Sequence, residues 1–152
     1  MREETRAAFE LALAGYEARS KAAVQDKENR LTQRLQFEVE CRQLRDSVVV
    51  PALKQLASEL LEPRGWKCEV RTVEKNSEAT LEIHRGDMKT VSSSERPLIG
   101  FRAEAHSPRL SVYTSADQQG GPPSTYPLAE ISDEFVHQQV LEFFRRLVSA
   151  RR

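Results

Sequence analysis

This sequence has little cysteine, little histidine and no net charge. Among its 152 residues there are two cysteines and three histidines, and 23 basic side chains balance 23 acidic ones. Two cysteines do not make the disulfide framework of a small secreted domain. The histidines (His84, His106 and His137) are far apart and have no second ligand at metal-site spacing, so we expect no metal. A chain without excess charge has no global field that would attract nucleic acid or an anionic membrane.

Long apolar runs are also missing. No stretch approaches the ~20 apolar residues that are needed to span a bilayer. The N-terminal segment MREETRAAFELALAGYE carries both acidic and basic residues and lacks the apolar centre of a signal peptide. We therefore expect no membrane association and a cytoplasmic protein, in which Cys41 and Cys68, both set in apolar patterns, are reduced and buried.

Catalytic motifs are absent as well. The chain contains neither G-x-S-x-G nor G-x-G-x-x-G, and QQGGPPS lacks the lysine and the helix start of a phosphate-binding loop. Cys41 falls within a predicted helix and Cys68 on the inward face of a predicted strand, where a thiolate is disfavoured. The sequence therefore predicts no catalytic residue and no cofactor, and it favours a protein that is not an enzyme.

Proline and glycine are almost absent from the first third of the chain. Between Arg2 and Val49 there is no proline, Gly15 is the only glycine, and good helix formers dominate. This predicts a long helix over residues 1–49, a coiled-coil-like extension. Its polar stretch QDKENR could instead be the turn of a helical hairpin, although it contains little turn chemistry. Pro51 follows a β-branched run and should kink or break the helix.

Residues 50–152 have the pattern of an α+β domain. After a short helix that Pro63 and Gly65 terminate, the apolar period changes to two. Four alternating segments joined by turns predict a four-stranded antiparallel β-meander: WKCEVRT, ATLEIHR, LIGFRAEAH and LSVYT. Ser132 resembles a helix N-cap, and the apolar spacing after it predicts a C-terminal helix. We expect an α+β fold in which this helix packs on the sheet.

Two apolar stripes lie on the predicted N-terminal helix. At about 100° per residue, they fall at clearly different angles, whereas a helix that covers one core needs a single stripe. The first consists of Phe37, Cys41, Leu44 and Val48, and we expect it to face the sheet domain. The second, which we call the outer stripe, consists of Phe9, Leu13, Tyr16, Val24, Leu31 and Leu35.

The outer stripe predicts a binding partner. A helix of residues 3–49 would be about 70 Å long, whereas the other ~100 residues form a body only about 30–35 Å across. That body cannot cover the whole helix, and an exposed apolar stripe marks an interaction site. We expect a homodimer or a helical protein partner. In the hairpin alternative, residues 5–24 would fold back on 31–49 and satisfy both stripes within one molecule.

Two long loops, 86–97 and 115–127, supply other candidate contacts: Asp87, Arg96 and Tyr126. A pocket between these loops, the sheet and the C-terminal helix would indicate a small-ligand-binding or enzymatic domain. The outward strand positions mix basic and acidic residues, which is typical of cross-strand ion pairs on a solvated face, so nucleic-acid binding is only a second alternative. The preferred function is a non-enzymatic adaptor or assembly module that self-associates through its N-terminal helix.

Overall fold

The computed structural model describes residues 1–85, 96–104, 108–115 and 124–149. Two compact units make up the chain, one of residues 1–37 and one of residues 38–152. The division suggested by the sequence, into 1–49 and 50–152, stays a prediction. No helix among the described residues is long and apolar enough to cross a membrane.

The N-terminal helix α1 runs without interruption over Glu3–Leu44. The polar QDKENR stretch is helical throughout, and Arg30 Nη2 lies 3.5 Å from Asp26 Oδ2, one turn earlier. Such i, i+4 pairs support a solvated helix where apolar contacts are missing. Because no turn separates residues 5–24 from 31–44, the helical hairpin considered from the sequence is wrong.

Pro51 changes the hydrogen bonding of the helix without ending it. A π-helical turn, η1 (Arg45–Val49), precedes helix α2 (Val50–Leu56), and the N–H of Val50 bonds to the carbonyl of Arg45, five residues back. In a regular α-helix the proline ring would clash with the carbonyl four residues earlier. The wider π turn leaves room for the ring. The backbone at Leu44 and Val49 stays right-handed helical, so the chain remains helical here. Of the kink or break expected at Pro51, the structure shows a local change from α-type to π-type hydrogen bonding.

The second helical segment ends as the sequence predicts. A π turn, η2 (Ala57–Leu61), and a 3-10 turn, η3 (Glu62–Arg64), lead into Gly65. Gly65 has a φ of 89°, a left-handed conformation that glycine adopts at little cost, and its N–H bonds to the carbonyl of Glu62.

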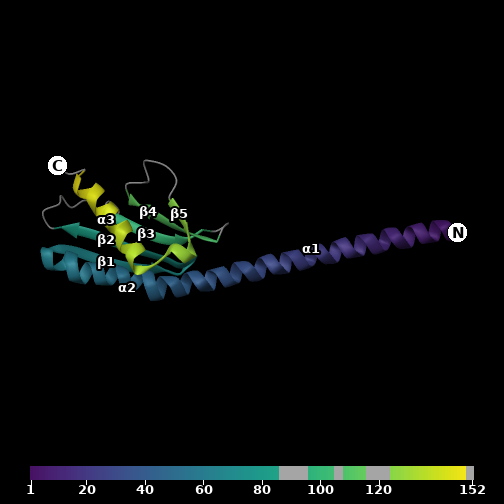
Figure 1. The fold of residues 1–152 in the computed structure, drawn as a ribbon, viewed down its shortest axis with the longest axis horizontal. Helices are drawn as coiled ribbons and strands as arrows, with labels where there is room; N and C mark the ends of the chain where they lie inside the picture. Colours follow the sequence, from purple (N-terminus) through teal and green to yellow (C-terminus); the bar gives the residue numbers. More distant parts are fainter. Residues whose placement is uncertain (86–95, 105–107, 116–123, 150–152) are drawn as a thin grey trace. The chain divides into compact units, whose positions relative to one another are not determined.

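The sheet has five antiparallel strands in chain order (Figure 1). They are β1 (Trp66–Val73), β2 (Glu78–Arg85), β3 (Leu98–Ala103), β4 (Arg109–Thr114) and β5 (Ser124–Pro127). A 3-10 turn, η4 (Lys75–Ser77), joins β1 to β2. The sequence predicted the first four strands as a meander and missed β5. That strand is four residues long, ends in proline and follows a Gly/Pro-rich segment, so it lacks the alternation that marks a strand.

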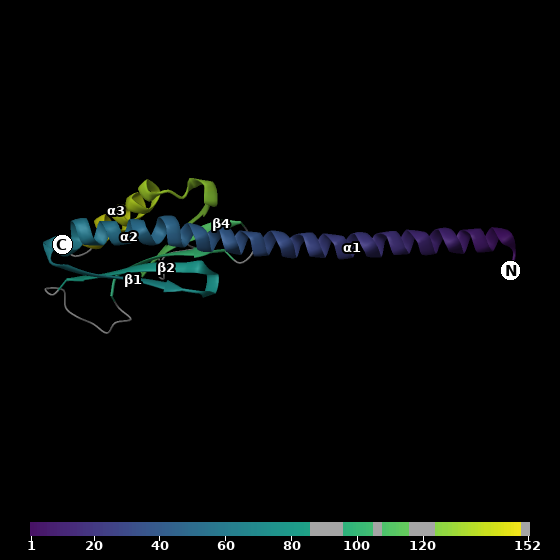
Figure 2. The same ribbon diagram turned by 90° about the horizontal axis from the view of Figure 1, so that it is seen from below.

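Helices α2 and α3 (Asp133–Ser149) lie on the same side of the sheet (Figure 2). A 3-10 turn, η7 (Leu128–Glu130), precedes α3, and the Ser132 hydroxyl accepts a 3.1 Å hydrogen bond from the N–H of Phe135, as an N-cap does. The core between helices and sheet contains Leu53, Leu81, Ile83, Phe101 and Val136, each at most 1% exposed. The predicted α+β architecture, with the C-terminal helix packed on the sheet, is therefore confirmed.

Arg45 is a buried cation that ties the helix to the first hairpin of the sheet. Only 6% of the residue is exposed. Its Nε donates to Asp46 Oδ1 at 2.9 Å, and its Nη1 donates to the carbonyl of Val73, the last residue of β1, at 3.3 Å. Glu74 lies 3.8 Å from Nη2. A buried guanidinium needs such partners, because desolvation of an unpaired charge is costly.

Candidate functional site

The outer stripe is exposed along its whole length. Its six side chains are between 54% and 66% exposed: Phe9, Leu13, Tyr16, Val24, Leu31 and Leu35. At about 100° per residue, they fall within a sector of about 100°, the width of a helix face that packs against a neighbour. An exposed apolar face of this extent is typical of a protein–protein contact.

The opposite side of α1 is a useful comparison. Leu11, only two residues before Leu13, is 77% exposed and points about 160° away from it on the helix. Among the polar groups, Arg19 donates to the carbonyl of Gly15, and Asp26 and Arg30 form an ion pair. Six large apolar side chains of the first unit therefore lie on the outer stripe, whereas Met1, Leu11 and Phe37 lie outside it.

Three members of the other stripe, Cys41, Leu44 and Val48, belong to the second unit. Cys41 is 1% exposed, and Leu44 and Val48 pack against the hydrophobic core. Burial, with smaller contributions from Glu40 and Glu38, raises the pKa of the Cys41 thiol to about 11. The prediction that this stripe faces the sheet domain is confirmed for these three residues, and Phe37 is half-buried.

The face of the sheet away from the helices is polar. Glu69 on β1 lies directly opposite Glu82 on β2, and like charges in this position repel each other. Each carboxylate has its own arginine. Arg71 donates to both oxygens of Glu69 at 2.8 and 2.9 Å, and Arg96 Nη1 lies 3.4 Å from Glu82 Oε1. The hydrogen bonds from Arg71 hold the pKa of Glu69 below its usual range.

These ion pairs differ in detail from the sequence expectation. The mixture of basic and acidic residues at the outward strand positions predicted ion pairs between strands. In the structure, Arg71 lies on the same strand as Glu69, and Arg96 precedes β3. Glu82 also differs from an ordinary solvated residue, because it is only 8% exposed although it points away from the core. The alternation of the strand predicts the side on which Glu82 lies, whereas its burial depends on neighbours that come from other strands.

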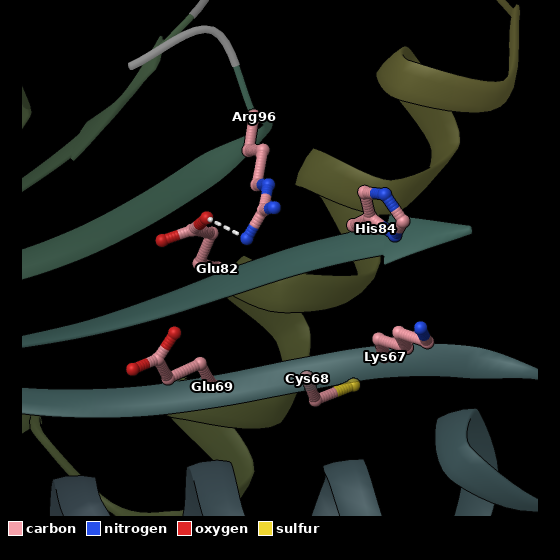
Figure 3. Close-up of a pocket in the computed structure, with 6 residues that line it drawn as sticks. All are labelled: Lys67, Cys68, Glu69, Glu82, His84 and Arg96. Atoms are coloured by element: carbon pink, nitrogen blue, oxygen red, sulfur yellow. Dashed lines mark hydrogen bonds and ion pairs between the residues drawn. The ribbon is translucent and has the colours of Figure 1, made fainter. Parts of the chain in front are cut away.

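A hollow of about 340 Å³ opens on this polar face (Figure 3). It is lined by Lys67, Cys68, Glu69, Glu82, His84 and Arg96. His84 Nδ1 and Arg96 Nε are buried and have no hydrogen-bond partner among the described residues. Arg96, a contact predicted from the sequence, therefore lies in a hollow whose donors and acceptors could bind a small polar molecule.

A second hollow, of about 540 Å³, lies between the α2–η2 segment and β1. Its lining mixes apolar residues with lysine, glutamine, serine and glutamate: Pro51, Lys54, Gln55, Ala57, Ser58, Glu59, Glu62, Cys68 and Val70. Burial, with a smaller contribution from Glu62, raises the pKa of Cys68 to about 11. A neutral thiol is a poor nucleophile, so this hollow offers no activated cysteine.

The remaining predicted contacts do not join a common site. Tyr126 lies on β5, pairs with Leu110 of β4, and packs edge-to-face on Phe135 with ring centroids 4.8 Å apart. Asp87 lies outside the described residues. Within the described ranges, no group of three His, Cys, Asp or Glu side chains could hold a metal ion.

One polar cluster was not anticipated from the sequence. The hydroxyl of Tyr113 on β4 donates to Glu78 of β2, and the guanidinium of Arg102 lies 4.8 Å from the centre of the Tyr113 ring. The ring crosses Gly100 of β3, which is paired with Tyr113. A lone glycine inside a strand often marks such a close approach, so Gly100 was the available signal.

Comparisons with protein-family models, with curated proteins and with solved structures return no match to this chain.

Proposed function

We propose that this chain is a non-enzymatic adaptor or assembly module that self-associates through the outer stripe of α1. The exposure of the six stripe side chains, each more than half accessible on one helix face, carries this proposal. A second copy of the chain is a suitable partner because it presents the same apolar face at the same spacing. Association would join two copies of the α+β unit into one bivalent particle.

The polar hollow supports a second candidate function, binding of a small polar ligand. The buried His84 Nδ1 and Arg96 Nε, which have no hydrogen-bond partner in the part of the chain that the structure describes, favour it. A panel of small carboxylates and phosphates, tested by thermal shift on the wild type and on Arg96→Gln, would detect such a ligand. Nucleic acid is less favoured, because acidic partners accompany Arg71 and Arg96 on this face.

The main test compares two leucines that lie two residues apart. Leu13→Asp places a charge in the outer stripe, and Leu11→Asp places the same charge on the opposite side of the same helix segment. We expect Leu13→Asp to weaken dimerisation at least 10-fold in sedimentation equilibrium, because it buries two carboxylates per dimer. Leu11→Asp should leave the dimer dissociation constant within 3-fold of wild type.

A stronger disruption tests the far end of the stripe. Leu31→Asp combined with Leu35→Asp should give a monomer that retains the melting transition of the α+β unit. Equal effects of Leu11→Asp and Leu13→Asp would argue against a specific face. Unfolding of the whole chain by the Leu31/Leu35 pair would mean that the stripe serves the fold of one molecule.

A further inference from the structure

We infer that the outer edge of β1 binds an extended segment of another protein, which joins the five-stranded sheet as a further strand. The segment carries apolar side chains at alternate positions and a lysine or arginine among them. This inference concerns a surface of the second unit and does not depend on self-association through the outer stripe. It is carried by the hydrogen bonding of the sheet and by the hollow beside β1.

The two edges of the sheet differ. Strand β5 forms one edge, is four residues long and ends in proline, as edges that avoid pairing often do. Strand β1 forms the other edge. It has eight residues, no proline and a regular register with β2. On the polar face of β1, Arg71 neutralises Glu69, so this face does not present a run of like charges that would repel a further strand. A long, regular edge of this kind can pair with another chain.

The hydrogen bonding of the sheet shows which peptide groups of β1 point outward. The N–H of Ile83 on β2 donates to the carbonyl of Pro97, which directly precedes β3. The peptide groups of Ile83 therefore point towards β3. Successive residues of a strand direct their N–H and C=O groups to opposite sides, so those of Glu82 point towards β1, where its partner is Glu69. The peptide groups of Glu69 thus belong to the β1–β2 ladder, and those of its two neighbours point away from β2.

Three residues of β1 direct their N–H and C=O groups to the outer edge by this alternation: Cys68, Val70 and Thr72. None of these peptide groups has a hydrogen-bond partner in the part of the chain that the structure describes. The residues are half-buried or exposed, so the edge lies at the surface. A segment in β conformation would satisfy the three donors and three acceptors through its own backbone, which gives affinity independently of its side chains.

The hollow beside β1 has room for side chains of such a segment. It measures about 540 Å³ and lies between β1 and the α2–η2 segment, which runs alongside the strand (Figure 1). Cys68 and Val70 line it from β1, and Pro51 and Ala57 are the apolar residues that line it from the helix. An added strand directs every second side chain to the face on which Cys68 and Val70 lie. Apolar side chains at alternate positions would therefore enter the hollow.

The charges of the hollow specify one position of the segment. The α2–η2 segment and β1 both lead away from the turn at Gly65, so residues at equal distances from this turn face each other. From the rise per residue, Glu59 lies about 9 Å and Cys68 about 10 Å from Gly65. Glu62 is close enough to contribute to the raised pKa of the Cys68 thiol. Lys54 lies farther along, about 16 Å from the turn. A basic side chain opposite Cys68 would thus face two carboxylates.

A library of random peptides displayed on phage supplies the probe. The peptides have about twelve residues, which is enough to pair with the whole of β1, and the target is the full-length chain. We expect the enriched peptides to have apolar residues at alternate positions, with lysine or arginine at one position of the same phase. Failure to enrich any peptide overturns the inference.

Val70→Pro tests the edge directly. It removes an N–H that points outward, and it leaves the ladder with β2 intact because that N–H takes no part in it. Val70→Thr is the matched control, since it keeps the N–H and the branched shape. A synthetic copy of an enriched peptide should bind Val70→Pro at least 10-fold more weakly than wild type in fluorescence anisotropy, and Val70→Thr within 3-fold. Equal binding to all three proteins overturns the inference.

Methylation of the peptide amides tests the same geometry without changing the protein, and so covers the case in which Val70→Pro does not fold. In an added strand, the N–H groups that face β1 occur at every second residue. N-methylation at these residues should abolish binding, and at the residues between them it should change the dissociation constant by less than 3-fold. Loss of binding at consecutive residues, or at none, overturns strand addition.

The basic position has its own test. Glu59→Gln together with Glu62→Gln should weaken the binding of a lysine-containing peptide about 3–10-fold at low salt. A peptide in which norleucine replaces that lysine should bind the double variant and the wild type equally. Unchanged binding of the lysine peptide to the double variant overturns the placement of a basic side chain opposite Cys68.

The mass in solution separates this inference from pairing between two copies and from the proposed function. If β1 paired with β1 of a second copy, folded Val70→Pro would lower the mass of a wild-type dimer, and this result overturns the inference. A monomeric wild type that binds the peptide contradicts self-association and supports the site at β1. The Leu31→Asp and Leu35→Asp pair should bind the peptide as wild type does.

Discussion

The ring of Tyr113 lies across Gly100 on the neighbouring strand, in the space that a side chain at position 100 would occupy. A Cβ atom at Gly100 would overlap the hydroxyl end of this ring. The hydroxyl donates to Glu78, two strands away, and Arg102 stacks over the ring. Gly100 thus allows one aromatic side chain to connect β4 to β2 across the polar face of the sheet.

Gly100→Ala should lower the free energy of unfolding by about 1–2 kcal/mol. The Tyr113 ring can swing away, but it then loses a hydrogen bond to a carboxylate and its contact with Arg102. Urea titration measures the loss. In a Tyr113→Ala background the same change should be neutral or slightly stabilising, because alanine suits a strand better than glycine. Equal effects in both backgrounds would show that the cost of Gly100→Ala does not come from displacing the Tyr113 ring.

Arg45→Met should destabilise the second unit by about 1–2 kcal/mol in chemical denaturation. The change keeps an unbranched side chain of similar length but leaves the carbonyl of Val73 without its charged donor. Arg42→Met, an exposed position one turn earlier, is the matched control and should change stability by less than 0.5 kcal/mol. If the two variants behaved alike, the Arg45 contacts would contribute nothing measurable.

Asp46 gives the Arg45 pair a pH dependence. The hydrogen bond from Arg45 lowers the pKa of Asp46 in the folded state, so its contribution is present above the unfolded pKa near 4. It is lost as the pH falls through the lowered pKa. Wild type should therefore lose more stability than Asp46→Asn between pH 5 and pH 2. Identical losses of unfolding free energy for the two proteins over this pH range would contradict this.

Arg96→Gln should destabilise the sheet by about 1 kcal/mol or more, because it leaves the nearly buried Glu82 carboxylate opposite Glu69 without a cation. The double variant Arg96→Gln with Glu82→Gln removes the charge as well as its partner and should recover most of the loss. Thermal melting of the wild type and both variants tests this. If the double variant were less stable than Arg96→Gln alone, unpaired charge would not be the cause.

The two thiols should resist alkylation at neutral pH. Burial raises both pKa values from about 9 to about 11, which keeps the thiolate scarce. The folded pKa values lie above the unfolded ones. The stability that the two neutral thiols contribute is therefore complete below pH 9 and is lost as the pH rises through 11. Iodoacetamide labelling followed by mass spectrometry should be slow at pH 8 and accelerate towards pH 11. Rapid labelling of Cys41 at pH 8 would contradict its burial. Cys68 is only partly buried, contrary to the expectation from the sequence, so its slow labelling depends on the raised pKa.

Local patterns were enough to predict most of the fold. The alternation in WKCEVRT and ATLEIHR predicted β1 and β2 and the side on which each residue lies, and the Ser132 cap predicted the start of α3. Strand β5 was missed because its pairing with β4 is a tertiary contact that a short proline-ended segment does not signal. The π turn before Pro51 depends on hydrogen bonding that residue preferences do not specify.

The candidate sites were only partly predictable. The outer stripe is a periodic feature of one helix, so spacing alone identified all six residues. The Glu69–Glu82 opposition and the passage of Tyr113 over Gly100 depend on strand register, which joins residues far apart in the chain. Arg96 was chosen for its place in a long loop, whereas its partner Glu82 became apparent only from the structure.

The most direct test of self-association is the mass of the full-length wild-type protein in solution. Light scattering coupled to size-exclusion chromatography, over a series from about 1 to 100 µM, should show a concentration-dependent rise to twice the chain mass of 17.3 kDa. The Leu13→Asp variant should remain near 17.3 kDa at concentrations where Leu11→Asp is dimeric. A wild-type mass of 17.3 kDa over the whole series would contradict the proposed role of the outer stripe in joining two copies.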